Sequence, residues 1–374
     1  MKKILIFYAS YGGGHLTAAK SIETYLKENY SDLDIELIDC MKYVSKAIEK
    51  VTTTAYKEMA KKLPWAWGRI YYDSQKPALA HISTRANSVL AIKLLNLLKE
   101  KSPDIIVSTH PFGSQMCAYL KRKNKINCTL ATILTDFKSH DQWLVNADNV
   151  DFFFVSNEDM KIELIKKDIN KEKIFVTGIP IRKDFLIKHN KKEILDALKF
   201  SENKKTILFF GGGEFGLGKN ATLNIFECLV KNFNAVQIIA ISGKNPTMNE
   251  NFNKIIIENN KTNSVRLFEY SDKIAEYMSI SDIVVTKPGG LTVSESLVSN
   301  VPLVIINPIP GQEEENAEFL QNKNVAKWIK TDEDIYPIFD TLLNNKNILN
   351  TMKENTKLIA KPNSTKDICE IVLN

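Results

Sequence analysis

Short apolar runs alternate with helix-length amphipathic segments along almost the whole chain of 374 residues. Most of the runs are continuous rather than alternating, which is typical of parallel strands whose two faces are both covered by helices. Alternating β and α units with right-handed crossovers predict an α/β fold with open, doubly wound sheets. The predicted strands are KILIFYA, DIELIDC, PDIIVSTH, CTLATIL, DFFFVS, KIFVTG, KTILFFGGG, AVQIIAIS, SVRLFEY, DIVVTK and VPLVIIN.

The alternation restarts after Ile187, where a polar, Lys-rich stretch leads into a new strand at Thr206. This restart predicts two doubly wound, Rossmann-like domains, residues 1–188 and 189–363. Pro362 ends the last long helix of the second domain, and a final helix, 364–374, is expected to return to the first. Two such domains facing each other bind ligands in the cleft between them, outside the carboxyl ends of their strands. The loops that follow strands are therefore the places to look for chemistry.

Composition and charge indicate the cellular compartment of the protein and the class of its partners. The first apolar run stops at Ala9, too short for a secretory signal, and no stretch reaches the length of a membrane span. The five cysteines are scattered without a CxxC pair, which indicates free thiols in the cytoplasm. The net charge of +6 is concentrated in residues 41–95, with ten Lys/Arg against three Asp/Glu. This segment is either a footprint for phosphate or anionic lipid or a solvated helix face.

The loop after the first strand reads Ser10-Tyr11-Gly12-Gly13-Gly14-His15 and leads into a helix expected to start near Leu16. Glycines let backbone N–H groups approach a ligand closely, and a helix N-terminus favours negative charge. The helix dipole would keep His15 neutral, as a general base requires. The alternative is a tight turn with a capping histidine.

A second glycine-rich loop follows the strand at Thr206 and includes Gly212 and Gly213. It nearly spells a nucleotide-binding P-loop, but Asn220 stands where the magnesium-binding Ser or Thr belongs. No later strand ends in a metal-binding Asp. The loop is therefore predicted to bind a diphosphate without a metal, and no other cofactor is expected.

Two further loops carry polar side chains after strands. In KPGGLTVSE, Gly290 exposes a helix N-terminus, and Glu295 could accept hydrogen bonds from sugar hydroxyls. Its spacing from Thr292 also fits a plain capping box. In PGQEEEN, Gln312 and Glu313 are expected in the same cleft as Glu295, although acidic residues at a helix start are also ordinary dipole partners.

Five motifs in this order resemble the family 28 glycosyltransferases of the GT-B fold, and the resemblance covers nearly the whole chain. They are GGGH, GIPIR at Gly178–Arg182, GGG at 211–213, KPGGLTVSE and PGQEEENA. Within that family the chain is more similar to the processive diacylglycerol glucosyltransferases and the plant monogalactosyldiacylglycerol synthases. The features behind this closer similarity are TDFKSHDQW at Thr135–Trp143, the intact GGGH and PGQEEEN.

The resemblance implies an inverting, metal-free transfer of glucose or galactose from UDP-glucose or UDP-galactose to diacylglycerol. Arg182 and the amides near Gly213 would face the diphosphate, and the backbone of Phe268 would bind uracil. Leu291 and Thr292 would lie along the phosphates. Glu295 would bind ribose, and Gln312 and Glu313 would bind the hexose, with Asn316 beside them. The implied donor-binding residues are Gly13, Gly14, Arg182, Gly212, Gly213, Phe268, Gly290, Leu291, Thr292, Glu295, Gln312, Glu313 and Asn316.

On the acceptor side, the resemblance implies that His15 and Asp136 face the attacking hydroxyl as candidate bases. The segment Met41–His81 mixes lysines with aromatic residues, which suits the headgroup layer of an anionic membrane at the inner face of the cell membrane. A buried helical hairpin is the alternative. The expected acceptor and membrane residues are His140, Trp143, Trp65, Trp67, Tyr71 and Tyr72.

Three rival functions remain open on the sequence. One is transfer to a polyprenyl-linked acceptor, a second is a UDP-hexosamine epimerase, and the third is a non-catalytic sugar-nucleotide sensor. No nucleic-acid partner is expected.

Overall fold

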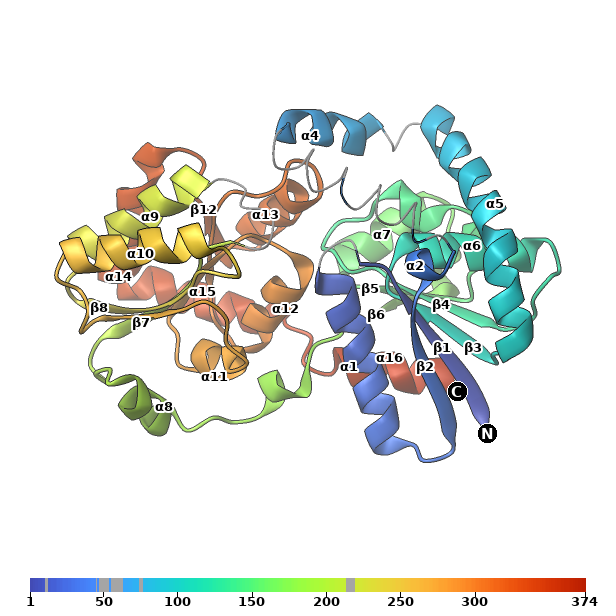
Figure 1. The fold of residues 1–374 in the computed structure, drawn as a ribbon, viewed down its shortest axis with the longest axis horizontal. Helices are drawn as coiled ribbons and strands as arrows, with labels where there is room; N and C mark the ends of the chain where they lie inside the picture. Colours follow the sequence, from blue (N-terminus) through green and yellow to red (C-terminus); the bar gives the residue numbers. More distant parts are fainter. Residues whose placement is uncertain (11–12, 45, 47–53, 55–62, 74–76, 213–218) are drawn as a thin grey trace. The chain divides into compact units, whose positions relative to one another are not determined.

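The computed structural model shows two compact α/β units, residues 1–182 with 361–374 and residues 183–360 (Figure 1). It describes residues 1–10, 13–44, 46, 54, 63–73, 77–212 and 219–374. The boundary lies between Arg182 and Lys183, a few residues before the predicted one. The reason is Phe185, which packs with the second unit's core and is only 7% exposed.

The first unit is built on a six-stranded sheet in the order β2-β1-β3-β4-β5-β6. All of its strand pairs are parallel. The strands are β1 (Lys2–Tyr8), β2 (Leu33–Asp39), β3 (Ile105–Ser108), β4 (Thr129–Ile133), β5 (Phe152–Val155) and β6 (Ile174–Val176). The helices are α1 (Gly13–Asn29), α2 (Cys40–Val44), α4 (Pro64–Asp73), α5 (Pro77–Lys101), α6 (Pro111–Arg122), α7 (Glu158–Lys166) and α16 (Ser364–Leu373), with short 3-10 helices η1 (Asp141–Leu144), η2 (Ala147–Asn149) and η3 (Lys171–Lys173).

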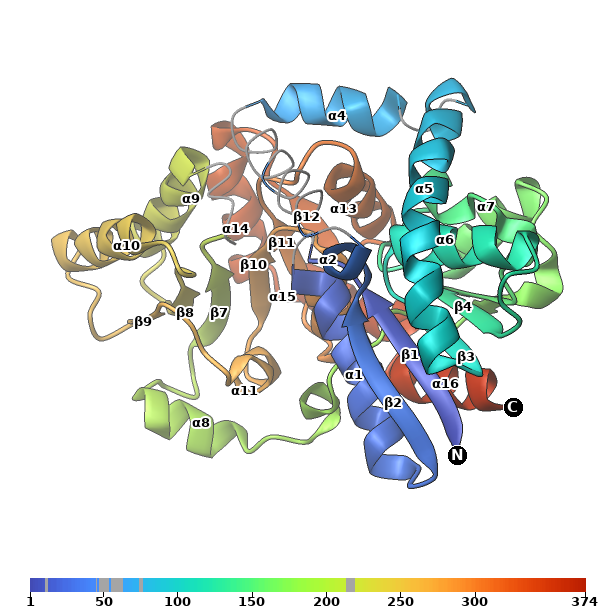
Figure 2. The same ribbon diagram turned by 45° about the vertical axis from the view of Figure 1, so that its right-hand side comes forward.

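Two apolar layers cover this sheet. Helices α1 and α16 pack on one face, and α2, α5, α6 and α7 pack on the other (Figure 2). Ile368, Cys369 and Val372 of α16 are buried against the same face as Ile22 of α1. The C-terminal helix therefore completes the core of the first unit.

The second unit has a parallel sheet in the order β12-β11-β10-β7-β8-β9. Helices α9, α10, α14 and α15 contribute to the core on one face, and α8 and α11 to the core on the other. The strands are β7 (Lys205–Phe210), β8 (Val236–Ile241), β9 (Val265–Phe268), β10 (Ile283–Thr286), β11 (Leu303–Ile305) and β12 (Ala326–Trp328). The helices are η4 (Lys183–Leu186), α8 (Lys191–Leu198), α9 (Lys219–Asn232), α10 (Pro246–Glu258), α11 (Ile274–Ser279), α12 (Gly290–Val298), α13 (Gln312–Asn322), η5 (Asp332–Asp334), α14 (Ile335–Asn344) and α15 (Lys346–Ile359).

The predicted doubly wound sheets are confirmed, and each of the predicted strands is present. The sequence pattern missed β12, because its three residues include Lys327 and give no apolar run. Within the residues described, no helix is long and apolar enough to cross a membrane.

Each sheet has one point where its strand order reverses, between β1 and β3 in the first unit and between β7 and β10 in the second. Read from β9, the second order is 3-2-1-4-5-6, the order of dinucleotide-binding folds. Ligands of open α/β sheets bind at such switch points, outside the carboxyl ends of the strands. The loops after these four strands are therefore the first candidates for a site in each unit.

Candidate active site

His15 lies at the switch point of the first unit, in the first turn of α1. The helix begins at Gly13, earlier than the predicted start near Leu16. The ring Nδ1 of His15 lies 2.6 Å from the carbonyl oxygen of Thr109, which follows β3. A carbonyl oxygen can only accept a hydrogen bond, so Nδ1 carries the proton and Nε2 carries the lone pair. The hydroxyl of Thr135, after β4, lies 3.2 Å from the same Nδ1.

A second histidine packs against His15. The ring centroids of His15 and His110 are 4.6 Å apart in an edge-to-face arrangement. His110 is buried, and its Nδ1 accepts a hydrogen bond from the backbone N–H of Phe112 as the N-cap of α6. Pro111 at the first helical position then fixes the start of that helix.

Both histidines are neutral near pH 7. The ring of His15 is surrounded by protein, and this burial lowers its pKa to about 4, although its hydrogen bond to Thr109 acts in the opposite direction. Burial, with the neighbouring His15 as the second cause, lowers the pKa of His110 well below its usual value. Burial is therefore the main cause of the neutral state of His15, whereas the sequence predicted an effect of the helix dipole. The residue as a whole is only partly buried.

Buried polar side chains of β3, β4 and α6 form hydrogen bonds close to this pair of histidines. Ser108 donates to the carbonyl of His110 at 2.8 Å, and the hydroxyls of Ser114 and Thr132 are 2.5 Å apart. Gln115 donates to the carbonyl of Gln142 at 2.5 Å. Buried networks in which each member has a partner make a core rigid. Sequence reasoning missed Thr109, His110 and Thr135 as site residues, although the polar Ser-Thr-His at the end of an apolar run was the available signal.

The other predicted residues after β4 are mostly buried. Asp136 is 7% exposed, and its carbonyl accepts a hydrogen bond from the hydroxyl of Ser156. His140 caps η1, where its Nδ1 accepts the N–H of Gln142 at 3.1 Å. Trp143 is only 4% exposed and belongs to the main core of the first unit, so its predicted place at the membrane surface is wrong. Its ring centroid lies 6.5 Å from that of His15, so the indole packs beside the imidazole.

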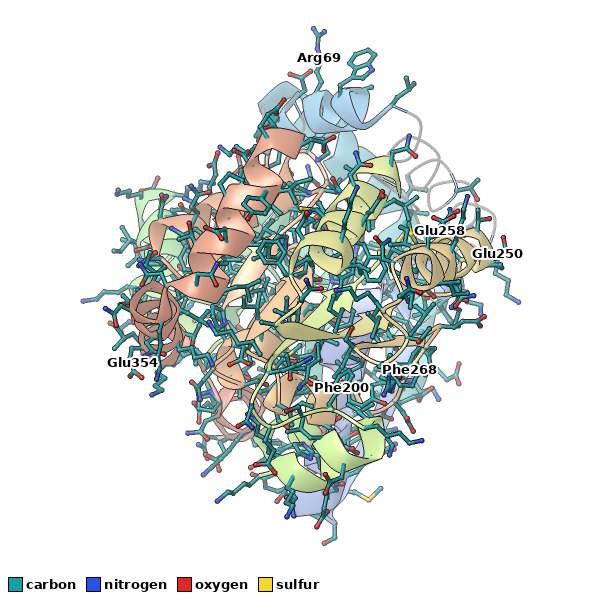
Figure 3. All side chains as sticks on the ribbon, turned by 90° about the vertical axis from the view of Figure 1, so that its left-hand side faces the viewer. Arg69, Phe200, Glu250, Glu258, Phe268 and Glu354 are labelled. Carbon is teal, nitrogen blue, oxygen red and sulfur yellow. The ribbon has the colours of Figure 1, made fainter. Side chains whose placement is uncertain are left out.

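Helix α4 presents aromatic and cationic side chains to solvent. Trp65 is 68% exposed and Tyr72 is 48% exposed. Arg69 extends outward from the same helix (Figure 3). Trp67 and Tyr71 lie on α4 too, but their side chains are outside the described part of the structure. The buried-hairpin alternative does not hold for Trp65, which is exposed on α4.

Glycines fall into two groups according to what a side chain would meet. Among the described residues, a Cβ at Gly13 or Gly212 would have no atom within 4 Å, and one at Gly289 would meet only an oxygen of Glu313 at 4.0 Å. By contrast, a Cβ at Gly211 would lie 2.8 Å from the Phe252 ring. The first group leaves backbone accessible at the loops after β1, β7 and β10, where a ligand could approach closely.

Gly243, after β8, lies against the backbone of Gly212. Its φ is +75°, and a Cβ there would lie 2.7 Å from the carbonyl oxygen of Gly212. The two loops therefore touch through their backbones. Gly213, the other predicted residue of this loop, lies outside the described residues.

The N-terminus of α12 is open. The helix begins at Gly290, and its N-cap residue Gly289 offers no side chain to the first N–H groups. Thr292 is already inside the helix, so the capping-box alternative for Glu295 does not hold. Leu291 and Glu295 are 8% and 7% exposed. This helix start is a candidate anion site of the second unit.

Helix α13 lies beside that loop. Glu314 accepts the N–H of Gly311 at 2.9 Å as a capping interaction, and Glu313 accepts the N–H of Ile309 at 2.7 Å. Gln312 is half-buried at the first position of the helix. Asn316 is fully buried and donates to the carbonyl of Pro288 at 3.0 Å. Asn316 therefore connects α13 to the loop before α12.

Phe268 and Arg182 are the remaining predicted donor residues. Phe268 ends β9, stacks its ring on Tyr277 at 5.5 Å, and accepts the N–H of Ser242 through its carbonyl (Figure 3). Arg182 is the last residue of the first unit's main segment and is half-buried. In the described ranges, no three His, Cys, Asp or Glu side chains are grouped so that they could bind a metal ion.

Comparison with known proteins identifies both units. Residues 15–181 match the family model described as monogalactosyldiacylglycerol (MGDG) synthase, and residues 206–369 match the glycosyltransferase family 28 C-terminal domain. Processive diacylglycerol β-glucosyltransferases from Bacillus cereus (strain G9842) and Bacillus cytotoxicus are each 29% identical to this chain. Each alignment covers 99% of this chain and 93% of the relative.

Solved structures agree with the fold. MurG of Acinetobacter baumannii has a TM-score of 0.69 at 15% identity, covering 100% of this chain and 99% of its own. The UDP-GlcNAc 2-epimerase of Neisseria meningitidis, solved with UDP-GlcNAc bound, has a TM-score of 0.64 at 17% identity, with both chains fully covered. The two family models match in order and together cover most of the chain, so the chain is similar to the family 28 glycosyltransferases along nearly its whole length, has the GT-B fold and is a hexosyltransferase.

Proposed function

We propose that this enzyme transfers glucose or galactose from a UDP-sugar to diacylglycerol, with inversion at the anomeric carbon. The name of the bacterial relatives supports the lipid acceptor, and the UDP-GlcNAc bound to a structural neighbour supports the class of donor. The observation that carries the proposal is His15, a neutral imidazole whose Nε2 holds the lone pair beside the open glycines of α1.

The mechanism is a single displacement. Nε2 of His15 takes the proton of the acceptor hydroxyl while the hydroxyl oxygen attacks the anomeric carbon and the bond from that carbon to the UDP oxygen breaks. Asp136, buried after β4, is the alternative base. Negative charge on departing UDP would be stabilised by the open N-terminus of α12 and by Arg182, which would replace a metal ion.

The donor residues have separate tasks in this proposal. Glu295 would bind ribose from inside α12, and Phe268 would bind uracil through its backbone. Gln312 and Glu313, at the start of α13, would contact the hexose. Gly290, Leu291 and Thr292 would lie along the phosphates, as Gly212 would on the neighbouring loop. Helix α4 would rest on the anionic inner face of the cell membrane, with the rest of the enzyme in the cytoplasm.

The proposal is tested by incubating the purified protein with diacylglycerol vesicles and labelled UDP-glucose or UDP-galactose, then separating the lipids. We expect label in a glycolipid of inverted configuration, undiminished by EDTA. Glu295→Ala should weaken UDP binding, whereas His15→Ala should keep it and lower turnover by about 10²–10⁴-fold. Label that appears only in another sugar nucleotide would support an epimerase instead. Activity lost on chelation and restored by manganese would contradict the metal-free mechanism.

A further inference from the structure

Thr109 contacts His15 through two different groups. Its carbonyl oxygen accepts the hydrogen bond from the ring Nδ1 at 2.6 Å. Its hydroxyl donates to the main-chain carbonyl of His15 at 2.9 Å and lies 3.2 Å from that of Phe7. One fully buried residue at the end of β3 therefore contacts both the ring and the backbone of the histidine.

Thr135 adds a third contact from the next strand. Its hydroxyl lies 3.2 Å from Nδ1 of His15, and the residue is 4% exposed. Strands β1, β3 and β4 are consecutive neighbours in the sheet, so His15, Thr109 and Thr135 follow three adjacent strand ends. Both oxygens lie on the Nδ1 side of the ring, and each can accept a hydrogen bond from the N–H at that position.

We propose that Thr109, assisted by Thr135, is a positioning residue that selects the Nδ1-protonated tautomer of His15 and presents Nε2 to the acceptor. This inference rests on the proposed role of His15 as the base. In serine hydrolases a carboxylate orients the histidine in a comparable way. Here both hydrogen-bond acceptors are uncharged, so they orient the ring while favouring a positive charge on it less than a carboxylate would.

The two hydrogen-bond acceptors beside Nδ1 of His15 decide which substitutions can test this proposal. The decisive carbonyl belongs to the main chain, so Thr109→Val keeps it and removes only the hydroxyl that ties it to His15. Thr109→Ser keeps the hydroxyl and serves as the matched control. Thr135→Val removes the second oxygen beside Nδ1 without touching the first.

The test combines NMR and kinetics. In protein labelled with ¹⁵N-histidine, the five histidines give few signals, and His15→Gln assigns the one from His15. We expect a single Nδ1–H tautomer in the wild type and in Thr109→Ser, and a mixture in Thr109→Val. Turnover should fall about 10- to 100-fold in Thr109→Val with unchanged affinity for UDP, and the serine variant should restore it. Thr135→Val should show a smaller change in the same two measurements.

Each outcome decides a separate point. Thr109→Val with one Nδ1–H tautomer and full turnover would overturn the positioning role, while an inactive His15→Ala would leave the proposed function in place. Full activity of His15→Ala would instead refute the role of His15 as the base, on which this inference rests, and would leave that role to Asp136, whereas the absence of any labelled glycolipid would refute the proposed function. If Thr109→Val does not fold, the wild-type spectrum decides, because an Nε2–H tautomer there would overturn the inference by itself.

Discussion

At the scale of single residues, the first unit contains a pair of histidines in a place where a charged imidazole is costly. His15 and His110 are in ring contact, and burial keeps both neutral. An unfolded chain exposes both rings to water and protonates them more readily. The same feature that suits His15 to act as a base therefore makes the folded state sensitive to acid.

This sensitivity can be measured. The pKa of His15 is about 4 in the folded protein and 6.5 when exposed, so between these values the unfolded state binds more protons. Its contribution to stability is complete above pH 6.5 and is lost as the pH falls towards 4. We expect the free energy of unfolding to depend less on pH in His15→Gln than in the wild type, by about 2–3 kcal/mol between pH 7 and 4.5. Urea titrations at both pH values measure this, with His189→Gln in the second unit as the control. Identical pH dependence in wild type and His15→Gln would show that the ring is not held neutral.

At the scale of elements, the strands were predictable because both faces of each sheet are covered, which leaves continuous apolar runs in the sequence. The residues that surround His15 were harder to predict. Thr109 reaches His15 because β3 pairs with β1, although the two strands are far apart in the chain. No local pattern contains that pairing. The burial of Trp143 could not be predicted for a similar reason. Its neighbours in the sequence are mostly polar, but η1 places the indole in the core.

Helix α4 gives a prediction about membrane binding. Trp65 is 68% exposed, whereas Trp143 is 4% exposed, so the two provide a matched pair. Trp65→Ser should reduce sedimentation with phosphatidylglycerol vesicles and leave the melting temperature nearly unchanged. Trp143→Ser should lower the melting temperature by many degrees, because it opens a cavity in the core. Binding to anionic vesicles should disappear in about 1 M salt. Equal recovery of wild type and Trp65→Ser with the vesicles would exclude Trp65 from the contact.

At the scale of the whole molecule, the chain leaves the first unit at Arg182 and returns to it at Lys361. The second unit is thus a single continuous segment, while the first is made of two pieces. Thr365 of the returning piece exchanges two hydrogen bonds with the backbone of Ile181, donating to its carbonyl at 2.8 Å and accepting its N–H at 3.0 Å. The two connections between the units are therefore fastened to each other.

Removing the returning piece should affect the two units unequally. A chain that stops after Ala360 lacks Ile368, Cys369 and Val372, which are nearly inaccessible in the core. Burial of such side chains contributes about 1.5–3 kcal/mol each, so the first unit should lose most of its stability. Hydrogen exchange should show unprotected amides in β1 and β3 and protected ones in β7 and β8. Equal protection of β1 in both chains would contradict the role assigned to α16.

The order of synthesis gives this arrangement a further meaning. A ribosome makes β1 to β6 first, yet α16, which covers one face of their sheet, emerges only after the whole of the second unit. Until then, the part of this apolar face that α16 covers beside α1 stays exposed. A chaperone that binds exposed apolar surface would therefore find this nascent chain for longer than one whose domains finish in order. His15 belongs to the unit that is completed last.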